Sequence, residues 1–345
     1  MNKYFSGVLL DERTDEAIEK DYLSIEVQGE GSQNWSSLKE LRSYPIWHQD
    51  GSGACVAFTV AKMASIELKR QTEEWLDLSP AFIYQKRVNR GRSGMIVADA
   101  FEIARKHGTT LEALMKSQNL TDEQIDSLEE TQFAKGIAKS LSDIINAYLY
   151  LPIDMGHIAD AIENGHGVAL LIYANFDEYN DVPQVKRTLN YLDAEVRHMV
   201  TAVDYYTHSE FGRVLVIEDS WGVGHGQGGR RLITEKFLSR RCITAVYFDH
   251  FEFDGFAMEM DEFKTPLAFS QQSDEVAKLQ DFLKTQNFFP SNQQSTGYYG
   301  NITRQAVLNW QLKELDDEVE VRSLQGRHFG PKSIARANEI IRLKI

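Results

Sequence analysis

The sequence predicts an α+β protein of two domains, in which helices precede a β-sheet and a small helical domain follows. Its 345 residues exceed one domain of ordinary size, at roughly 150 residues per domain. Apolar residues recur at helical spacing in the first half, and short β-branched and aromatic runs follow from residue 168. The net charge is −15 over residues 1–265 and +1 over residues 266–345, which places a domain boundary near residue 265.

The first half is predicted to be mostly helical. Residues 54–70 contain no Gly or Pro and carry apolar side chains at the spacing of a buried helix. A second helix is expected to begin after the cap residue Ser79, and a third to cover residues 97–106. Helical spacing continues over residues 121–147, where Thr121 fits the start of a capping box.

Three strands are predicted after these helices. Residues 168–173, 199–205 and 214–217 are short runs bounded by Gly, Asp and Asn. Helices followed by strands favour a helical layer facing a sheet, with a cleft between them.

Composition excludes several classes of function. The net charge of −14 argues against nucleic acid as a ligand, because such binding relies on Lys and Arg to neutralise phosphates. No apolar run approaches the roughly 20 residues of a membrane-spanning helix, so we expect no membrane insertion. Asp11 and Glu12 interrupt the apolar core that a secretion signal needs, so no standard signal peptide is expected. The protein is expected to be made in the cytoplasm and to reach its site of action by lysis, by non-standard export or as part of a phage virion.

Cys55 has the setting of a nucleophile. It follows Gly51 and Gly53 at the first turn of the predicted helix 54–70, where unpaired amides and the helix dipole stabilise a thiolate. Gln49 stands six residues earlier and could share an oxyanion hole with the Cys55 amide. For a lone cysteine, a buried structural thiol would be the usual interpretation.

Two residues further along supply the partners of a cysteine nucleophile. His198 opens the predicted strand 199–205, 143 residues after Cys55, and Asp219 follows the strand 214–217. A nucleophile, a base and an orienting acceptor therefore occur in the chain order of a cysteine peptidase.

These motifs resemble the papain family of cysteine peptidases over roughly residues 40–250. The family pattern runs from Gln through Gly-Ser-Cys-Gly-Ser-Cys-Trp-Ala-Phe to His-Ala-Val and Asn-Ser-Trp-Gly. The matching positions are Gln49, Cys55, Ala57, Phe58, His198, Val200, Ser220, Trp221 and Gly222. The resemblance implies a papain-like two-lobed domain, one lobe helical and one a β-sheet, with Cys55, His198, Asp219 and Gln49 catalytic.

Other features of the motif carry supporting roles by this resemblance. Trp221 is expected to shield the hydrogen bond between His198 and Asp219 from water, with Ser220 beside it and Gly53 allowing close approach of substrate. No cofactor is implied. Fewer than 50 residues precede Gln49, so inhibition by a long pro-segment is not expected, although residues 1–30 can still cover the cleft.

The main departure from the family pattern is Asp219, which stands where the family has Asn. A carboxylate should favour imidazolium and raise the pKa of His198, which predicts an active site with a shifted pH profile. Ser52 replaces a family cysteine that usually forms a disulfide, and Cys242 is read as a structural thiol, so a chain without disulfides is expected.

No metal site is predicted. The remaining histidines lack ligand spacing, and the acidic loop 177–181 is interpreted as a solvent-exposed surface loop rather than a cation site.

The carboxy-terminal segment is predicted to be a small three-helix domain over residues 273–345, joined by a linker at 265–272 to the papain-like domain of residues 1–264, whose first 39 residues form an extension. It resembles peptidoglycan-binding modules, in particular at the two Gly-x-x-Thr/Ser turns at 300–303 and 330–333, which suggest an internal repeat. The candidate ligand residues are Tyr298, Tyr299, Thr303 and Trp310. A plain three-helix interaction module, with these aromatic residues in its core, is the alternative.

The sequence therefore predicts a hydrolase: a thiol protease, acting as a cysteine endopeptidase on a peptide or protein substrate and tethered to bacterial cell wall through peptidoglycan. The alternative is a catalytically idle papain-like scaffold that serves as a wall-binding or bacteriophage virion protein. The sequence does not determine the cleavage specificity or the oligomeric state.

Overall fold

The computed structural model of the protein divides into two compact units. It describes residues 7–9, 35, 44–142, 145–174, 178–185, 197–251, 262–286, 288–290, 293–315 and 318–342. The first unit comprises residues 1–109, 117–128 and 142–253, and the second comprises residues 110–116, 129–141 and 254–345.

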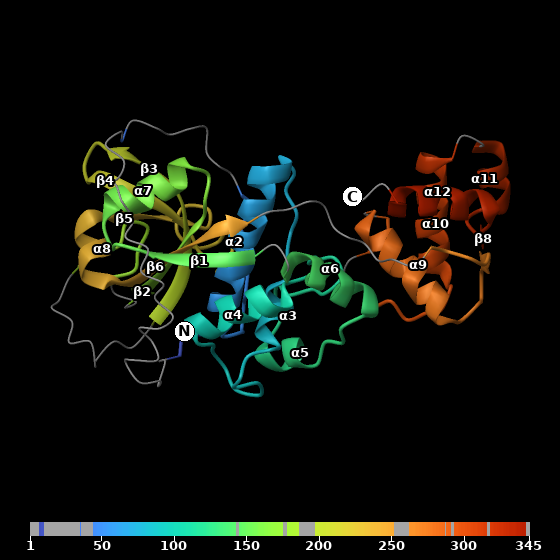
Figure 1. The fold of residues 1–345 in the computed structure, drawn as a ribbon, viewed down its shortest axis with the longest axis horizontal. Helices are drawn as coiled ribbons and strands as arrows, with labels where there is room; N and C mark the ends of the chain where they lie inside the picture. The colour runs from blue at the N-terminus through green and yellow to red at the C-terminus, as the bar shows by residue number, and fades with distance from the viewer. Residues whose placement is uncertain are drawn as a thin grey trace. The chain divides into compact units, whose positions relative to one another are not determined.

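The helices of the first unit are arranged around α2. The helices of this layer are α2 (Cys55–Thr72), α3 (Pro80–Tyr84), α4 (Val97–His107) and α5 (Asp122–Asp126). α2 packs against α3 and α4 and also against the sheet (Figure 1). The predicted caps are present, since the Ser79 side chain accepts a hydrogen bond from the Phe82 amide and Thr121 forms a capping box with Gln124.

The sheet of the first unit has six antiparallel strands in the order β1-β6-β2-β3-β4-β5. The strands are β1 (Ile145–Leu151), β2 (Val168–Tyr173), β3 (Arg197–His208), β4 (Gly212–Glu218), β5 (Arg230–Thr234) and β6 (Cys242–Phe251). Two helices accompany them, α7 (Met155–Glu163) and α8 (Glu235–Arg241). The three predicted strands correspond to β2, β3 and β4.

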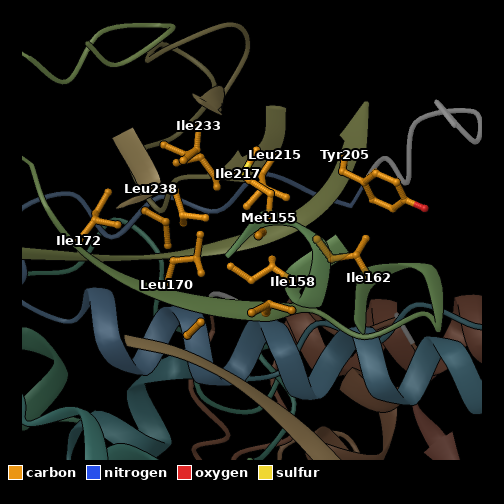
Figure 2. Packing of buried hydrophobic residues seen from close by; sticks show 14 of the residues in the cluster. Met155, Ile158, Ile162, Leu170, Ile172, Tyr205, Leu215, Ile217, Ile233 and Leu238 are labelled. Atoms are coloured by element: carbon orange, nitrogen blue, oxygen red, sulfur yellow. The ribbon is translucent and has the colours of Figure 1, made fainter. Parts of the chain in front are cut away.

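The pleat of the sheet separates two apolar clusters. On β4, Val214 and Val216 pack with Ile66 of α2, whereas Leu215 and Ile217 belong to a larger cluster with α7. This is the alternation expected of a strand buried on both faces. Figure 2 shows the packing of the larger cluster and labels Met155, Ile158, Ile162, Leu170, Ile172, Tyr205, Leu215, Ile217, Ile233 and Leu238.

One predicted helical region is wrong at its end. Helical spacing was expected up to residue 147, but α6 (Gln132–Ser142) ends earlier and Ile145 begins β1. β1 pairs with β6, which lies about 100 residues later in the chain. Long-range pairing overrides the local pattern here, and neither β5 nor β6 was predicted.

The second unit contains the carboxy-terminal helices. They are α9 (Asp274–Thr285), α10 (Asn301–Glu314), α11 (Glu318–Leu324) and α12 (Pro331–Arg342), and α6 belongs to this unit up to residue 141. α9, α10 and α12 are the three predicted helices, and α11 is an additional short one. The region predicted as a linker contains β7 (Leu267–Ala268), which pairs with β8 (His328–Phe329), and Phe263 lies in the core of the unit.

The two Gly-x-x-Thr/Ser turns are held by the same contact. Gln280 Nε2 donates to the Thr303 hydroxyl at 2.8 Å, and Gln311 Nε2 donates to the Ser333 hydroxyl at 2.8 Å. Each amide also donates to a carbonyl in the preceding turn, at 3.0 and 2.8 Å. The two turns share this contact geometry, which gives the repeated sequence pattern a structural explanation.

Among the described residues, no helix combines the length and apolar character needed to cross a membrane.

Candidate active site

Cys55 is the first residue of α2 and is 0% exposed. Its predecessor Ala54 has no side chain that could cap the helix, so the amides of the first turn are not satisfied by a capping side chain. An uncapped helix amino terminus favours a negative charge, as a thiolate or an oxyanion. The helix therefore places the thiol where an acyl-transfer nucleophile is stabilised.

Two motifs that lie far apart in the sequence pair directly beside Cys55. The Gln49 amide donates to the Ser220 carbonyl at 2.8 Å, and the Gly222 amide donates to the Trp47 carbonyl at 3.0 Å. The Ser220 hydroxyl also donates to Gln49 Oε1, and Gln49 Nε2 donates to the Ser52 carbonyl at 2.7 Å. Ser220 thus fixes the orientation of the Gln49 side-chain amide. Nε2 uses one of its two hydrogens for the Ser52 carbonyl, so the second one is not used by these contacts.

His198 lies on β3 and contacts both Asp219 and Trp221. Its Nε2 is 3.2 Å from Asp219 Oδ1, and both side chains are 0% exposed. The Trp221 ring stacks on the imidazole, with 4.4 Å between centroids and 22° between planes. Trp221 is itself 5% exposed, so its ring packs in the interior against the imidazole that contacts Asp219.

The electrostatics of these groups favour a thiolate–imidazolium pair. Burial would raise the pKa of Cys55, but His198 and the backbone amides of Met199 and Gly7 lower it below its ordinary value. Burial would lower the pKa of His198, but Asp219 and Cys55 raise it to about 9. The other ring nitrogen, Nδ1, makes no hydrogen bond of normal geometry with described residues, yet Cys55 and His198 are close enough to shift each other's pKa.

Asp219 has two further partners that the sequence analysis did not identify. The Tyr179 hydroxyl donates to Oδ1 at 2.8 Å, and Arg231 Nε donates to Oδ2 at 2.6 Å. Tyr179 lies in the segment interpreted above as a solvent-exposed loop. That interpretation is wrong for Tyr179, which is 6% exposed, and for Glu178, which is fully buried in an ion pair with Arg241.

A second network of hydrogen bonds holds Gly53, two residues before the thiol, and Gly94. Asp122 Oδ1 accepts from the Gly53 amide at 2.9 Å and from the Tyr84 hydroxyl at 2.8 Å. The same hydroxyl accepts from the Gly94 amide at 2.9 Å. A Cβ at Gly53 would lie 2.3 Å from Ser93 Oγ, so the close approach of these segments requires glycine.

An amino-terminal segment lies against the same glycines. The Leu9 amide donates to the Met95 carbonyl at 3.0 Å, and the Met95 amide donates to the Gly7 carbonyl. A Cβ at Gly7 would lie 1.6 Å from the Gly53 carbonyl oxygen. Residues 7–9 therefore occupy space beside the thiol, within the range 1–30 that was expected to be able to cover the cleft.

Both cysteines are free, so the chain has no disulfide. Burial raises the pKa of Cys242 to about 12, which leaves that thiol protonated at neutral pH. Among the described residues, no group of three or more His, Cys, Asp or Glu side chains is placed to hold a metal ion.

The structure contradicts three of the four predicted wall-binding residues. Tyr299, Thr303 and Trp310 are each at most 1% exposed, because they form the core and the turn contacts of the second unit, and only Tyr298 is accessible, at 46%. A pocket of about 450 Å³ lies elsewhere on this unit. Its lining includes Leu315, Glu320, Val321, Leu324, His328 and Lys332.

Comparison with known proteins agrees with this arrangement. A sequence model described as papain family cysteine protease matches residues 31–243, more than half of the chain. No curated protein sequence matches the chain. The fold is similar to xylellain, a cysteine protease from Xylella fastidiosa, with 16% identity, a TM-score of 0.55, and coverage of 73% of this chain and 98% of that one.

A second solved structure, described for the mite allergens Blo t 1 and Der p 1, is also similar. It has 18% identity and a TM-score of 0.50, and covers 68% of this chain and 78% of that one.

Proposed function

The chain belongs to the papain family of cysteine proteases, and from the geometry of its site we propose that it cleaves peptide bonds through Cys55, His198 and Asp219. The observation that carries this proposal is the buried Nε2–Oδ1 contact of 3.2 Å between His198 and Asp219, next to a thiol at a helix amino terminus. The family membership and the fold support a hydrolase.

Each group has one task in the proposed reaction. The Cys55 thiolate attacks the substrate carbonyl, and the His198 imidazolium donates its proton to the leaving amine. The oxyanion of the intermediate is stabilised by the Cys55 backbone amide and the Gln49 side chain. Water then hydrolyses the thioester, with neutral His198 accepting the proton.

Thiol labelling tests this proposal without knowledge of the substrate. Iodoacetamide at pH 7 should modify Cys55 and leave Cys242 unmodified, because only Cys55 has a lowered pKa. Cys55→Ala should abolish hydrolysis of a peptide library, whereas Cys242→Ser, the matched control, should retain it. Equal hydrolysis by Cys55→Ala would show that Cys55 is not the nucleophile, and no hydrolysis by the wild type would favour an idle scaffold.

We also propose that the second unit binds peptidoglycan and tethers the protease to the cell wall, through the pocket rather than through the buried aromatic residues. The pocket offers what a peptide-bearing sugar polymer needs, because its lining combines apolar side chains such as Leu315 and Val321 with polar ones, among them the ion pair of Lys332 and Glu320. Its volume of about 450 Å³ is within the range of small-ligand sites.

Sedimentation of the full chain with purified peptidoglycan tests the tether. Leu324→Asp, in the pocket lining, should release most of the protein from the pellet. Val319→Asp is the matched control, because Val319 is on the same helix but is 82% exposed and does not line the pocket. Equal pelleting of both variants would exclude the pocket, and no pelleting of the wild type would exclude the tether.

A further inference from the structure

We propose that Arg231 and Tyr179 are positioning residues, which fix the Asp219 carboxylate and balance its charge so that His198 remains able to give up its proton. This inference rests on the proposed chemistry of Cys55 and His198. It assigns a function to two residues that do not contact the reacting atoms.

The geometry leaves the carboxylate no freedom to turn. Oδ1 accepts from His198 at 3.2 Å and from Tyr179 at 2.8 Å, while Oδ2 accepts from Arg231 at 2.6 Å. Rotation of the carboxylate would break a charge-assisted hydrogen bond in a site from which water is excluded. The position of the carboxylate, and through it that of the imidazole, therefore depends on Tyr179 and Arg231.

The sheet determines where Arg231 lies. On β5 it pairs with Ile217 of β4, and Asp219 follows two residues later on the same side of the pleat. The guanidinium carbon lies 4.5 Å from the centre of the Tyr179 ring and 5.8 Å from that of Trp221. Two aromatic rings thus hold the cation beside the carboxylate.

Charge balance is the physical reason for the arrangement. A thiolate, an imidazolium and a carboxylate alone would bury a net charge of −1, which is strongly unfavourable in a protein interior. Arg231 brings the sum to zero. The positive charge also weakens the attraction of Asp219 for the imidazolium proton, which has to leave in the proposed reaction.

The other charged and titratable groups near the site are few among the described residues. Asp181 Oδ1 lies 3.9 Å from Arg231 Nη1, but the Asp181 side chain is largely exposed. Burial and the charge of Arg231 lower the pKa of His225, and the charge of Asp219 acts in the opposite direction. Tyr179 remains a neutral donor, because burial and the neighbouring carboxylate raise its pKa well above the ordinary value.

The histidine titration tests the inference directly. The His198 midpoint, followed by NMR of histidine-labelled protein, should rise in Arg231→Met by about one pH unit, roughly a tenfold gain in proton affinity. The midpoint of the alkaline limb of the kcat/KM profile should shift to higher pH by the same amount. kcat should fall about tenfold, because the imidazolium is then a weaker acid. Arg231→Lys keeps the charge and should restore the midpoint. Tyr179→Phe should lower kcat and leave KM unchanged.

A double variant separates charge balance from packing. Asp219→Asn leaves Arg231 buried without a counter-charge, and adding Arg231→Met removes that charge, so the double variant should be more stable and more active than Asp219→Asn alone. Arg230→Met is the matched control, because Arg230 pairs with Glu218 and should leave the His198 midpoint unchanged.

The inference would be overturned by an unchanged His198 midpoint in Arg231→Met. It would also be overturned if the two substitutions acted independently, so that the fold-loss of activity in the double variant equalled the product of the two single fold-losses. If the wild type hydrolyses no peptide, the proposed function fails, but the NMR midpoint still decides whether Arg231 controls the imidazole.

Discussion

Gly7→Val should open the active site by expelling residues 7–9. The backbone of Gly7 is so close to Gly53 that an added Cβ would lie 1.6 Å from its carbonyl oxygen, whereas real Cβ atoms stay beyond about 3.0 Å. The obstacle is backbone rather than a flexible side chain. The amino-terminal segment, not Gly53, is then expected to move, because Gly53 is held by Asp122.

The magnitude follows from the contacts that are lost. Displacement breaks the two backbone hydrogen bonds to Met95, each of which contributes about 0.5–1.5 kcal/mol net. A loss of about 1–3 kcal/mol in the covered state corresponds to a roughly 5- to 150-fold larger open fraction. Since Cys55 is 0% exposed in the covered state, its rate of alkylation should increase by that factor.

The assay is the second-order rate constant of Cys55 alkylation by iodoacetamide, measured as a function of pH. The plateau of this profile reports access to the thiol, and its acid limb reports the pKa of the thiol. The Gly7 amide helps to lower the pKa of Cys55, so the acid limb should shift to slightly higher pH while the plateau rises. Gly136→Ala is the control, because a Cβ there meets nothing within 4 Å. An unchanged plateau in Gly7→Val would refute the reasoning.

Three further outcomes are expected. Hydrolysis should decline as pH rises through about 9, where His198 loses its proton, whereas alkylation should not decline because the thiolate persists. Tyr84→Phe should cost about 1–3 kcal/mol of unfolding free energy in urea, because it removes a buried donor to Asp122 and an acceptor; a smaller loss would mean that water replaces the hydroxyl. Trp310→Ala should destabilise the second unit by about 3–5 kcal/mol and Tyr298→Ala by under about 0.5 kcal/mol in thermal melts; equal effects would contradict the burial of Trp310.

Local chemistry made part of the structure predictable from the sequence. The helix at Cys55 and the strand at residues 168–173 have strong periodic patterns with clear boundaries, and the Thr121 capping box requires only neighbouring residues. β1 was missed because helical spacing continues into its first residues and its pairing partner lies about 100 residues away, although Tyr148 and Tyr150 alternate with leucines as in a strand.

The same distinction applies to the carboxy-terminal unit. Aromatic and hydroxyl residues next to glycine turns are consistent with either a ligand site or a core, and only burial separates the two. Tyr299 and Trp310 are core residues, and the Thr303 hydroxyl is consumed by Gln280. The pocket is lined by residues of α10, α11, β8 and α12 and by Pro266, which no single motif contains.

The sequence by itself identified the candidate nucleophile, base and acceptor, because each stands in a motif whose residue types and spacing favour that chemistry. Only the tertiary structure decided what surrounds them. Arg231 and Tyr179 reach Asp219 from a neighbouring strand and from an acidic segment, and Gly7 reaches the thiol from a segment 48 residues earlier in the chain. A carboxylate interacts with whatever charge the fold brings close to it, and that proximity is set by sheet register rather than by sequence distance.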